Sequence, residues 1–184
     1  MEGYIEEFNF DPNFDFSYFH KKYIEELLDY LDRRLGNCVL DIGRQSPSTE
    51  AIREKFRIPV TNTEGDLDVQ FGFPSLPYTD ILYLRTLNHQ FNPLYTLLKI
   101  KDEAMSDFTK LYILVPSRGK LLWDKGCYHE VDHYRMCQLL KRAGLKIREY
   151  ERVKVHRHWS FYFKGVRPLL KLFFEYNAFY VVTK

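Results

Sequence analysis

The segment Cys38-Val39-Leu40-Asp41-Ile42-Gly43 decides the fold of this chain. A short apolar run closed by a glycine is typical of a buried parallel strand that leads into a turn. The turn continues as Arg44-Gln45-Ser46-Pro47, in which a serine followed by a proline favours the start of a helix. We therefore expect a strand, a tight turn and a helix that reaches about Phe56.

Further helical and strand patterns lie on both sides of this strand. Strands are predicted at 58–63, 79–84, 111–115, 145–150 and 178–183, and Pro116 is expected to end the third of these. Helices are predicted at about 18–35, with Ser17 as its cap and Gly36 past its end, at 93–104, and from a cap at Asp132 to Gly144. This alternation predicts an α/β fold: a doubly wound, mostly parallel sheet with helices on both faces and a ligand at the carboxyl ends of its strands.

Length and composition favour a single domain over residues 1–184. The chain has 184 residues, of which 45% are hydrophobic, so it can bury a substantial core. Residues 1–36 form an N-terminal arm and helix, and residues 152–177 form a basic, aromatic crossover before the last strand. No stretch suggests a linker that would divide the chain.

The distribution of charge bears on possible partners. The net charge of +2 is too small to indicate a nucleic-acid partner, which we do not expect. Residues 152–171 nevertheless contain six Lys or Arg residues, no carboxylate and several aromatic side chains. This segment is either a crossover with its aromatic side chains packed inward, which we favour, or a surface that contacts an anionic substrate, a nucleic-acid strand or a membrane.

The sequence also predicts a cytoplasmic location. No apolar run approaches the about 20 residues that a membrane-spanning helix needs. The acidic start of the chain lacks the basic region of a signal peptide, and the three cysteines form no CxxC pair, which is typical of a reducing compartment.

Four motifs along the chain together resemble one protein family. Val39-Leu40-Asp41-Ile42-Gly43 resembles the first motif of class I S-adenosylmethionine-dependent methyltransferases, and Leu87-Asn88-His89-Gln90-Phe91-Asn92-Pro93 resembles the His-x-x-x-Pro segment of their methyltransferase type 11 branch. Tyr128-His129-Glu130-Val131-Asp132 and Leu139-Leu140-Lys141-Arg142-Ala143-Gly144-Leu145 resemble two later segments of that branch. The resemblance covers residues 38–150. It implies a Rossmann-like methyltransferase fold with an antiparallel last strand, and S-adenosylmethionine as cofactor.

The resemblance also implies which residues contact the cofactor. Asp41 and Gly43 correspond to the turn that holds its methionine end, Glu64 to the acid that binds the ribose hydroxyls, and Asp66 to the acid that faces the adenine. Glu64 and Asp66 lie so close in sequence that the helix and strand normally between them are shortened or missing. Leu84 and Arg85 end the strand that faces the cofactor, and Arg85 replaces the usual glutamate.

Three residues are candidates for catalysis on the small-molecule or glycan-like acceptor that the branch implies. His89 is the first candidate for the base that a hydroxyl acceptor requires, because histidine titrates near neutral pH. Its structural alternative is a histidine that hydrogen-bonds the loop before the next helix. His129 and Glu130 are second candidates, for which a structural role is the favoured reading.

Two competing interpretations remain. The first is a methyltransferase-fold protein that no longer catalyses and serves as a binding or scaffold module, which Gln45, Pro47 and Arg85 favour. The second is a zinc hydrolase, because residues 129–133 match the HExxH pattern. Asp132 suits a helix N-cap, however, which would place His129 before the helix, so we predict no metal site.

Overall fold

The computed structural model describes residues 18–74, 77–117, 128–153, 163, 165–166, 169–170, 173 and 176–184. A six-stranded sheet with strand order β2-β1-β5-β6-β8-β7 forms its centre. The strands are β1 Val39–Asp41, β2 Val60–Asn62, β5 Asp80–Leu84, β6 Lys110–Ser117, β7 Lys146–Val153 and β8 Tyr176–Thr183. Only β8 runs against its neighbours β6 and β7, so the predicted mostly parallel sheet with an antiparallel last strand is confirmed.

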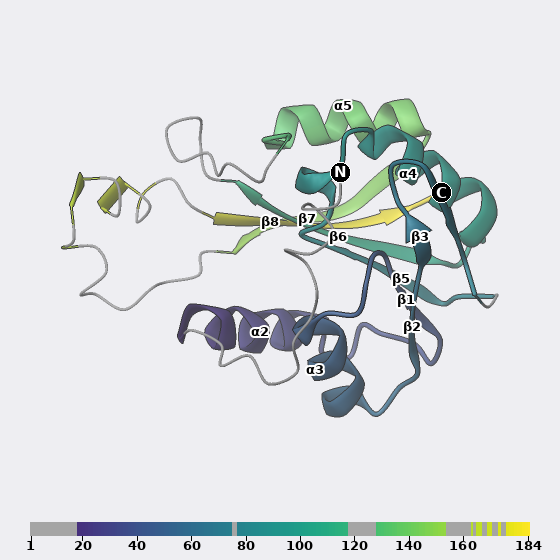
Figure 1. Cartoon of the computed structure of the whole chain (residues 1–184), viewed down its shortest axis with the longest axis horizontal. Helices are drawn as coiled ribbons and strands as arrows, with labels where there is room; N and C mark the ends of the chain where they lie inside the picture. Colours follow the sequence, from purple (N-terminus) through teal and green to yellow (C-terminus); the bar gives the residue numbers. More distant parts are fainter. Residues whose placement is uncertain are drawn as a thin grey trace.

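Helices cover both faces of this sheet (Figure 1). On one face lie α2 Tyr18–Leu31 and α3 Pro47–Phe56; on the other lie α4 Pro93–Lys99, the π-helical turn η2 Ile100–Ala104 that continues it, and α5 His133–Ala143. A short 3-10 turn, η1 Leu87–His89, follows β5. Each face buries its own apolar cluster against the sheet.

The helix ends show why these segments form where they do. Ser46 caps α3 through a capping box with Thr49, and Asp132 caps α5 by accepting the N–H of Arg135 at 2.8 Å. Gly144 ends α5 in the left-handed conformation. The predicted starts of both helices and the predicted end of α5 are therefore confirmed. The expected cap at Ser17 lies outside the described residues.

Gly36 and Pro116 play roles different from those expected. Helix α2 ends at Leu31, four residues early, and Gly36 instead allows a close approach: a Cβ there would lie 2.7 Å from Thr79 Oγ1. Strand β6 continues past Pro116 to Ser117. At that point β5 has already ended, opposite Leu114, so β6 is paired on one side only and tolerates a residue without an N–H.

A hairpin that the sequence analysis did not predict joins β2 to β5. Strands β3 Glu64–Asp66 and β4 Gln70–Gly72 pair antiparallel in a separate two-stranded sheet. The hairpin packs beside α4, where Lys99 Nζ donates to the Phe71 carbonyl at 2.6 Å. Strand β3 is exposed and has no apolar side chain, and β4 buries only Phe71, so both strands are too short to show a clear apolar alternation in the sequence.

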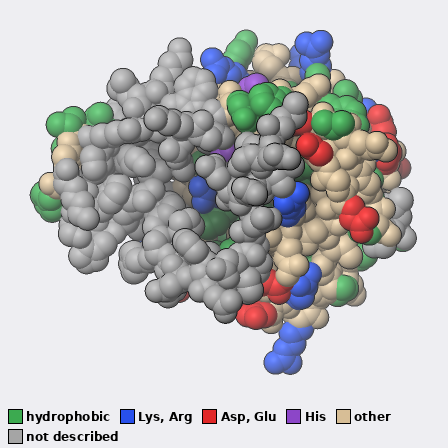
Figure 2. Space-filling model, in the orientation of Figure 1, with side chains coloured by type: hydrophobic (Ala, Val, Ile, Leu, Met, Phe, Trp, Pro, Cys, Tyr) green, Lys and Arg blue, Asp and Glu red, His purple; other side chains and the backbone are tan. Residues whose placement is uncertain are grey.

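Two further expectations can be compared with the described residues only. Among these residues no helix is long and apolar enough to cross a membrane. On the face that Figure 2 shows, the coloured Lys and Arg side chains alternate with Asp and Glu side chains rather than gathering in one patch. The arm at 1–17 and most of the basic segment 152–171 lie outside the described residues.

Candidate functional site

The sheet contains a topological switch point at β1. From β1 the chain passes through α3 to β2 on one side, and later enters β5 on the other side. In open α/β sheets such a reversal leaves a crevice at the carboxyl ends of the strands, where ligands bind. We refer to the region above Gly43 at the carboxyl ends of β1 and β5 as the switch-point crevice.

Gly43 lies in the turn after β1, at the switch point, in a conformation that favours glycine. Its φ is 113°, and a Cβ there would meet only Thr86, at 3.6 Å, so conformation rather than space requires glycine. Its N–H donates to Thr63 Oγ1 at 2.8 Å, and its carbonyl accepts the Asn62 side-chain amide at 3.2 Å. The end of β2 therefore fixes the turn that follows β1.

The unusual residues of this turn serve helix α3. Pro47 occupies the first turn of α3, where a missing N–H costs no helical hydrogen bond. The side-chain amide of Gln45 donates to the Glu50 carboxylate, which also accepts from Arg53 at 2.6 Å. Both departures from a glycine-rich loop are thus explained by the way α3 begins.

Asp41 lies beneath the turn rather than in the open crevice. Its side chain is 4% exposed and accepts hydrogen bonds from Thr49 Oγ1, at 2.5 Å, and from the Asn62 side chain. Burial raises the pKa of Asp41 to about 7, and the two hydrogen bonds limit the rise. Asp41 therefore joins β1 to α3 and β2 below the crevice.

Glu64 and Asp66 occupy exposed positions on β3. Glu64 directly follows Thr63, whose hydroxyl oxygen accepts the N–H of Gly43. Glu64 is therefore next in sequence to a residue that contacts the Gly43 turn. The Asp66 carboxylate instead accepts the N–H of Asp68 at 2.9 Å within the hairpin turn. Asp66 therefore lies at the turn of the hairpin.

Leu84 ends β5 beside the crevice, and Arg85 directly follows it. Arg85 adopts a left-handed φ of 59°, and its N–H donates to the Leu114 carbonyl at 2.8 Å. Its guanidinium lies over the Tyr23 ring of α2, with Cζ 5.0 Å from the ring centroid. The positive charge is thus directed toward α2.

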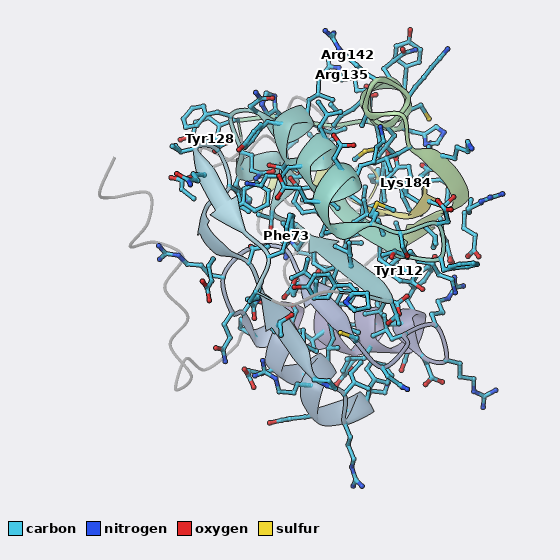
Figure 3. All side chains as sticks on the ribbon, turned by 90° about the vertical axis from the view of Figure 1, so that its right-hand side faces the viewer. Phe73, Tyr112, Tyr128, Arg135, Arg142 and Lys184 are labelled. Atoms are coloured by element: carbon cyan, nitrogen blue, oxygen red, sulfur yellow. The ribbon has the colours of Figure 1, made fainter. Side chains whose placement is uncertain are left out.

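His89 lies in a segment, residues 88–91, whose backbone hydrogen-bonds to residues 128 and 129. The carbonyl of Asn88 accepts the N–H groups of Tyr128 and His129, at 2.9 and 3.2 Å. His129 Nε2 lies 3.1 Å from the Phe91 carbonyl, and because a carbonyl can only accept, this nitrogen carries a proton. The Glu130 carbonyl accepts Arg135 Nη1 at 3.0 Å, and Tyr128 lies near the tip of the hairpin (Figure 3).

The HExxH pattern does not occupy one helix. His129 precedes the cap at Asp132, whereas His133 is the first residue of α5. The His133 ring lies 3.3 Å from the Tyr180 hydroxyl and 3.6 Å from Cys137 Sγ. Within the part of the chain that the structure describes, no three His, Cys, Asp or Glu side chains are grouped to hold a metal ion.

A second hollow, which we call the α2 cleft, was not predicted. It lies between one face of α2 and the carboxyl half of the sheet, is partly open to solvent, and has about 10 Å³ of free space, about enough for one water molecule. Its α2 side consists of Tyr23, Glu26, Leu27 and Tyr30. Its sheet side consists of Leu114, Val153, Asn177 and Phe179.

The sequence contained one signal for the α2 cleft. Tyr23, Glu26 and Tyr30 recur at helical spacing on the apolar side of α2, so a carboxylate interrupts a face that otherwise packs as core.

Comparisons with known proteins show which solved structures share this fold. No protein-family model matches the chain, and no curated protein matches its sequence. A chain from the complex between the Haloferax volcanii Trm112 methyltransferase activator and a methyltransferase has a TM-score of 0.62 and 13% identity, over 90% of each chain. Magnesium protoporphyrin IX methyltransferase (ChlM) from Synechocystis PCC 6803, with bound SAH, has a TM-score of 0.54 and 11% identity, over 100% of this chain and 93% of that one.

The [4+2]-cyclase SpnF is also similar, with a TM-score of 0.55 and 11% identity over 89% of this chain and 80% of that one. At these identities the likeness concerns the backbone alone. The strand order, the antiparallel last strand and the switch point agree with it. The chain therefore has the fold of the class I S-adenosylmethionine-dependent methyltransferases.

Proposed function

We propose that this protein binds S-adenosylmethionine in the switch-point crevice and transfers its methyl group to a small-molecule acceptor. The observation that carries the proposal is the Gly43 turn: a left-handed glycine at the switch point, fixed by Asn62 and Thr63, in a chain with this fold. Such a turn lets a ligand approach the backbone closely.

The chain offers groups suited to each part of this cofactor. The Gly43 turn would contact the methionine end, with Leu84 beside it. Glu64, exposed next to the turn, would accept hydrogen bonds from the ribose hydroxyls, and Asp66 is the candidate for the adenine. Asp41 would act as a positioning residue, because its carboxylate is already bonded to Thr49 and Asn62.

The chemistry of methyl transfer asks little of the protein beyond alignment and proton removal. When bound, S-adenosylmethionine supplies a methyl group activated by a sulfonium. That methyl group would pass to an oxygen or nitrogen of the acceptor, and sulfur would keep the electrons of the broken bond. We assign removal of the acceptor's proton to His89. His129 would hold the neighbouring loop through Asn88 and Phe91, and the Glu130 carbonyl accepts Arg135 Nη1.

Calorimetric titration with S-adenosylhomocysteine tests the binding step directly. We expect saturable heat and a raised melting temperature in the wild-type protein, and weaker binding in Glu64→Gln. Asp68→Asn, a change of the same kind further along the hairpin, is the matched control. No heat and no thermal stabilisation at millimolar ligand would refute the proposal.

A second candidate function is a methyltransferase-fold protein that binds ligands without methyl transfer. It is favoured by the similarity to SpnF, which is named a cyclase. Binding of S-adenosylhomocysteine together with no methylated product from any acceptor that binds the protein would support this candidate over the first.

A further inference from the structure

Exposed apolar side chains gather in one stretch of the chain, residues 152–173, which we call the basic crossover. Among the described residues nine large apolar side chains are exposed, and four of them lie within this stretch: Phe163 (82% exposed), Val166 (74%), Leu169 (44%) and Phe173 (62%). Apolar side chains scattered singly are normal on a protein surface, whereas a group of them marks a surface that contacts something else. At these positions the side chains do not pack inward, which is the arrangement that the sequence favoured.

These side chains stand apart from the body of the protein. Figure 1 shows the described residues of the basic crossover, in yellow-green, at the far left, away from the sheet and from helix α5. In the same orientation, hydrophobic side chains lie at the left edge of the molecule (Figure 2). The apolar groups therefore face solvent and not the core.

Three of the exposed side chains share one helical face. Val166, Leu169 and Phe173 have helical backbone, and their spacings of three and four residues place them on the same side of a helix. A helix face of this kind is stable in water only at a cost, so it suits a partner surface that is itself apolar.

The charge of the basic crossover indicates the chemistry of that partner. Its six Lys or Arg residues are accompanied by no Asp or Glu. Apolar side chains flanked by cations complement an anionic lipid bilayer, because the apolar groups enter the acyl boundary while the cations bind lipid phosphates. A nucleic acid would also attract the cations, but Val166 and Leu169 offer no ring on which a base could stack.

The basic crossover joins the sheet at the edge that holds the switch-point crevice. Val153 pairs with Asn177, so the chain leaves β7 and returns to β8 at neighbouring positions. Strand β7 runs parallel to β6 and β5, because both β6 and β7 are antiparallel to β8, so Val153 lies at the carboxyl edge of the sheet. Arg152 Nε donates to the Tyr150 hydroxyl at 2.6 Å, which fixes the first cation of the crossover at this edge.

We propose that the basic crossover docks the protein onto the surface of an anionic lipid bilayer. The four exposed apolar side chains enter the interface, and the cations bind lipid phosphates. Cations interrupt the apolar residues of the crossover, so it lies on the bilayer and does not provide the run of about 20 apolar residues that would span it. This docking does not depend on the proposed methyl transfer.

Sedimentation with lipid vesicles tests the docking directly. Vesicles of phosphatidylcholine with phosphatidylserine are compared with vesicles of phosphatidylcholine alone. We expect binding to the anionic vesicles to be about tenfold tighter or more, and to weaken when the salt is raised from about 0.1 M to about 1 M. No binding to the anionic vesicles at the lower salt concentration would overturn the proposal.

A charge variant tests the contribution of the cations. Each cation near an anionic bilayer contributes about fivefold to affinity, so the triple variant Lys164→Gln, Arg167→Gln, Lys171→Gln should bind the anionic vesicles about 10²-fold more weakly. The control is Lys141→Gln, Arg142→Gln, Lys146→Gln, which removes the same charge from exposed positions near the opposite edge of the sheet. Equal losses in the two triple variants would reveal a general charge effect and overturn the proposal.

An apolar variant tests the contribution of the exposed side chains. Phe163→Ser, Phe173→Ser should weaken vesicle binding about tenfold or more, because less apolar surface enters the bilayer. Phe108→Ser is the matched control, since Phe108 is 92% exposed and precedes β6 at the opposite edge. All three side chains are exposed, so the melting temperature should not fall. Unchanged vesicle affinity in the double variant would overturn the proposal.

Tryptophan fluorescence shows which face meets the bilayer. Phe173→Trp is introduced in a chain whose two own tryptophans are replaced, by Trp123→Phe and Trp159→Phe. Its emission should shift to shorter wavelength when anionic vesicles are added, because the ring enters an apolar medium. Phe108→Trp in the same background should show no shift. A shift for Phe108→Trp and none for Phe173→Trp would place the bilayer on another face and overturn the proposal.

Two further ligands distinguish this inference from its alternatives. Binding of a single-stranded oligonucleotide of mixed sequence, together with no binding of anionic vesicles, would assign the basic crossover to nucleic acid and overturn the proposal. Binding of S-adenosylhomocysteine without vesicle binding would refute the docking alone. Vesicle binding without binding of S-adenosylhomocysteine would support the docking and refute the proposed function.

Discussion

The guanidinium of Arg85 lies over the ring of Tyr23, with Cζ 5.0 Å from the ring centroid. Arg85 directly follows a sheet strand and Tyr23 lies on α2, so this contact joins the switch-point crevice to the α2 cleft. A cation over an aromatic face is stabilising, and the contact directs the positive charge of Arg85 toward α2.

Arg85→Ala should therefore affect stability more than cofactor binding. We expect a loss of about 0.5–1 kcal/mol in the free energy of unfolding, measured with urea, because the cation-π contact is removed. The affinity for S-adenosylhomocysteine should change by less than about threefold. A gain of tenfold or more would mean that the guanidinium does face the ligand. Arg148→Ala on β7, away from the crevice, is the control.

Gly43→Ala should lower both stability and ligand affinity. An alanine must adopt a φ near 113°, which costs on the order of 1–3 kcal/mol, and relaxation of the strain would shift the turn. Gly72→Ala provides the matched control, since a Cβ at Gly72 meets nothing within 4 Å. Equal effects of the two substitutions on S-adenosylhomocysteine binding would count against a crevice site.

Asp41 should make stability depend on pH. Its pKa rises from 3.8 to about 7 on folding, so between these values the folded state holds a proton that the unfolded state has released. The contribution of Asp41 to the free energy of unfolding therefore falls as pH rises from about 4 to about 7, and stays low above that.

Asp41→Asn removes this titration. The difference in free energy of unfolding between wild type and Asp41→Asn, measured by urea unfolding at several pH values, should shift in favour of the variant as pH rises through this window. The exposed Asp66→Asn is the control. A difference that does not vary with pH would contradict the buried position of Asp41.

His89→Ala and His129→Ala should differ in kind. His129 donates to the Phe91 carbonyl, so its loss should cost about 0.5–1.5 kcal/mol of stability. The His89→Ala substitution removes the proposed base, so it should lower kcat for a hydroxyl acceptor by about 10²-fold or more. It should change the KM for S-adenosylmethionine little. Equal kcat in His89→Ala and wild type would remove His89 from the catalytic role.

Local sequence signals determined much of this fold. The apolar run 38–43, the cap residues Ser46 and Asp132, and the stop at Gly144 act through short-range hydrogen bonds and backbone preferences. These effects are nearly independent of the rest of the chain, so strand and helix order could be predicted. The antiparallel last strand came from the resemblance of the motifs, and the sheet topology agrees with it.

Only the tertiary structure decided what surrounds the candidate sites. The orientation of Arg85 depends on Tyr23, and the hydrogen bonds of Gly43 depend on Asn62 and Thr63, which are distant in sequence. The β3-β4 hairpin has only short strands, of which β3 has no apolar residue, and Lys99 of α4 bonds to its Phe71 carbonyl. The α2 cleft exists only where a helix packs on strands from the other end of the chain. The sequence thus specified elements and a switch point through local preferences, whereas long-range packing decided which side chains meet there.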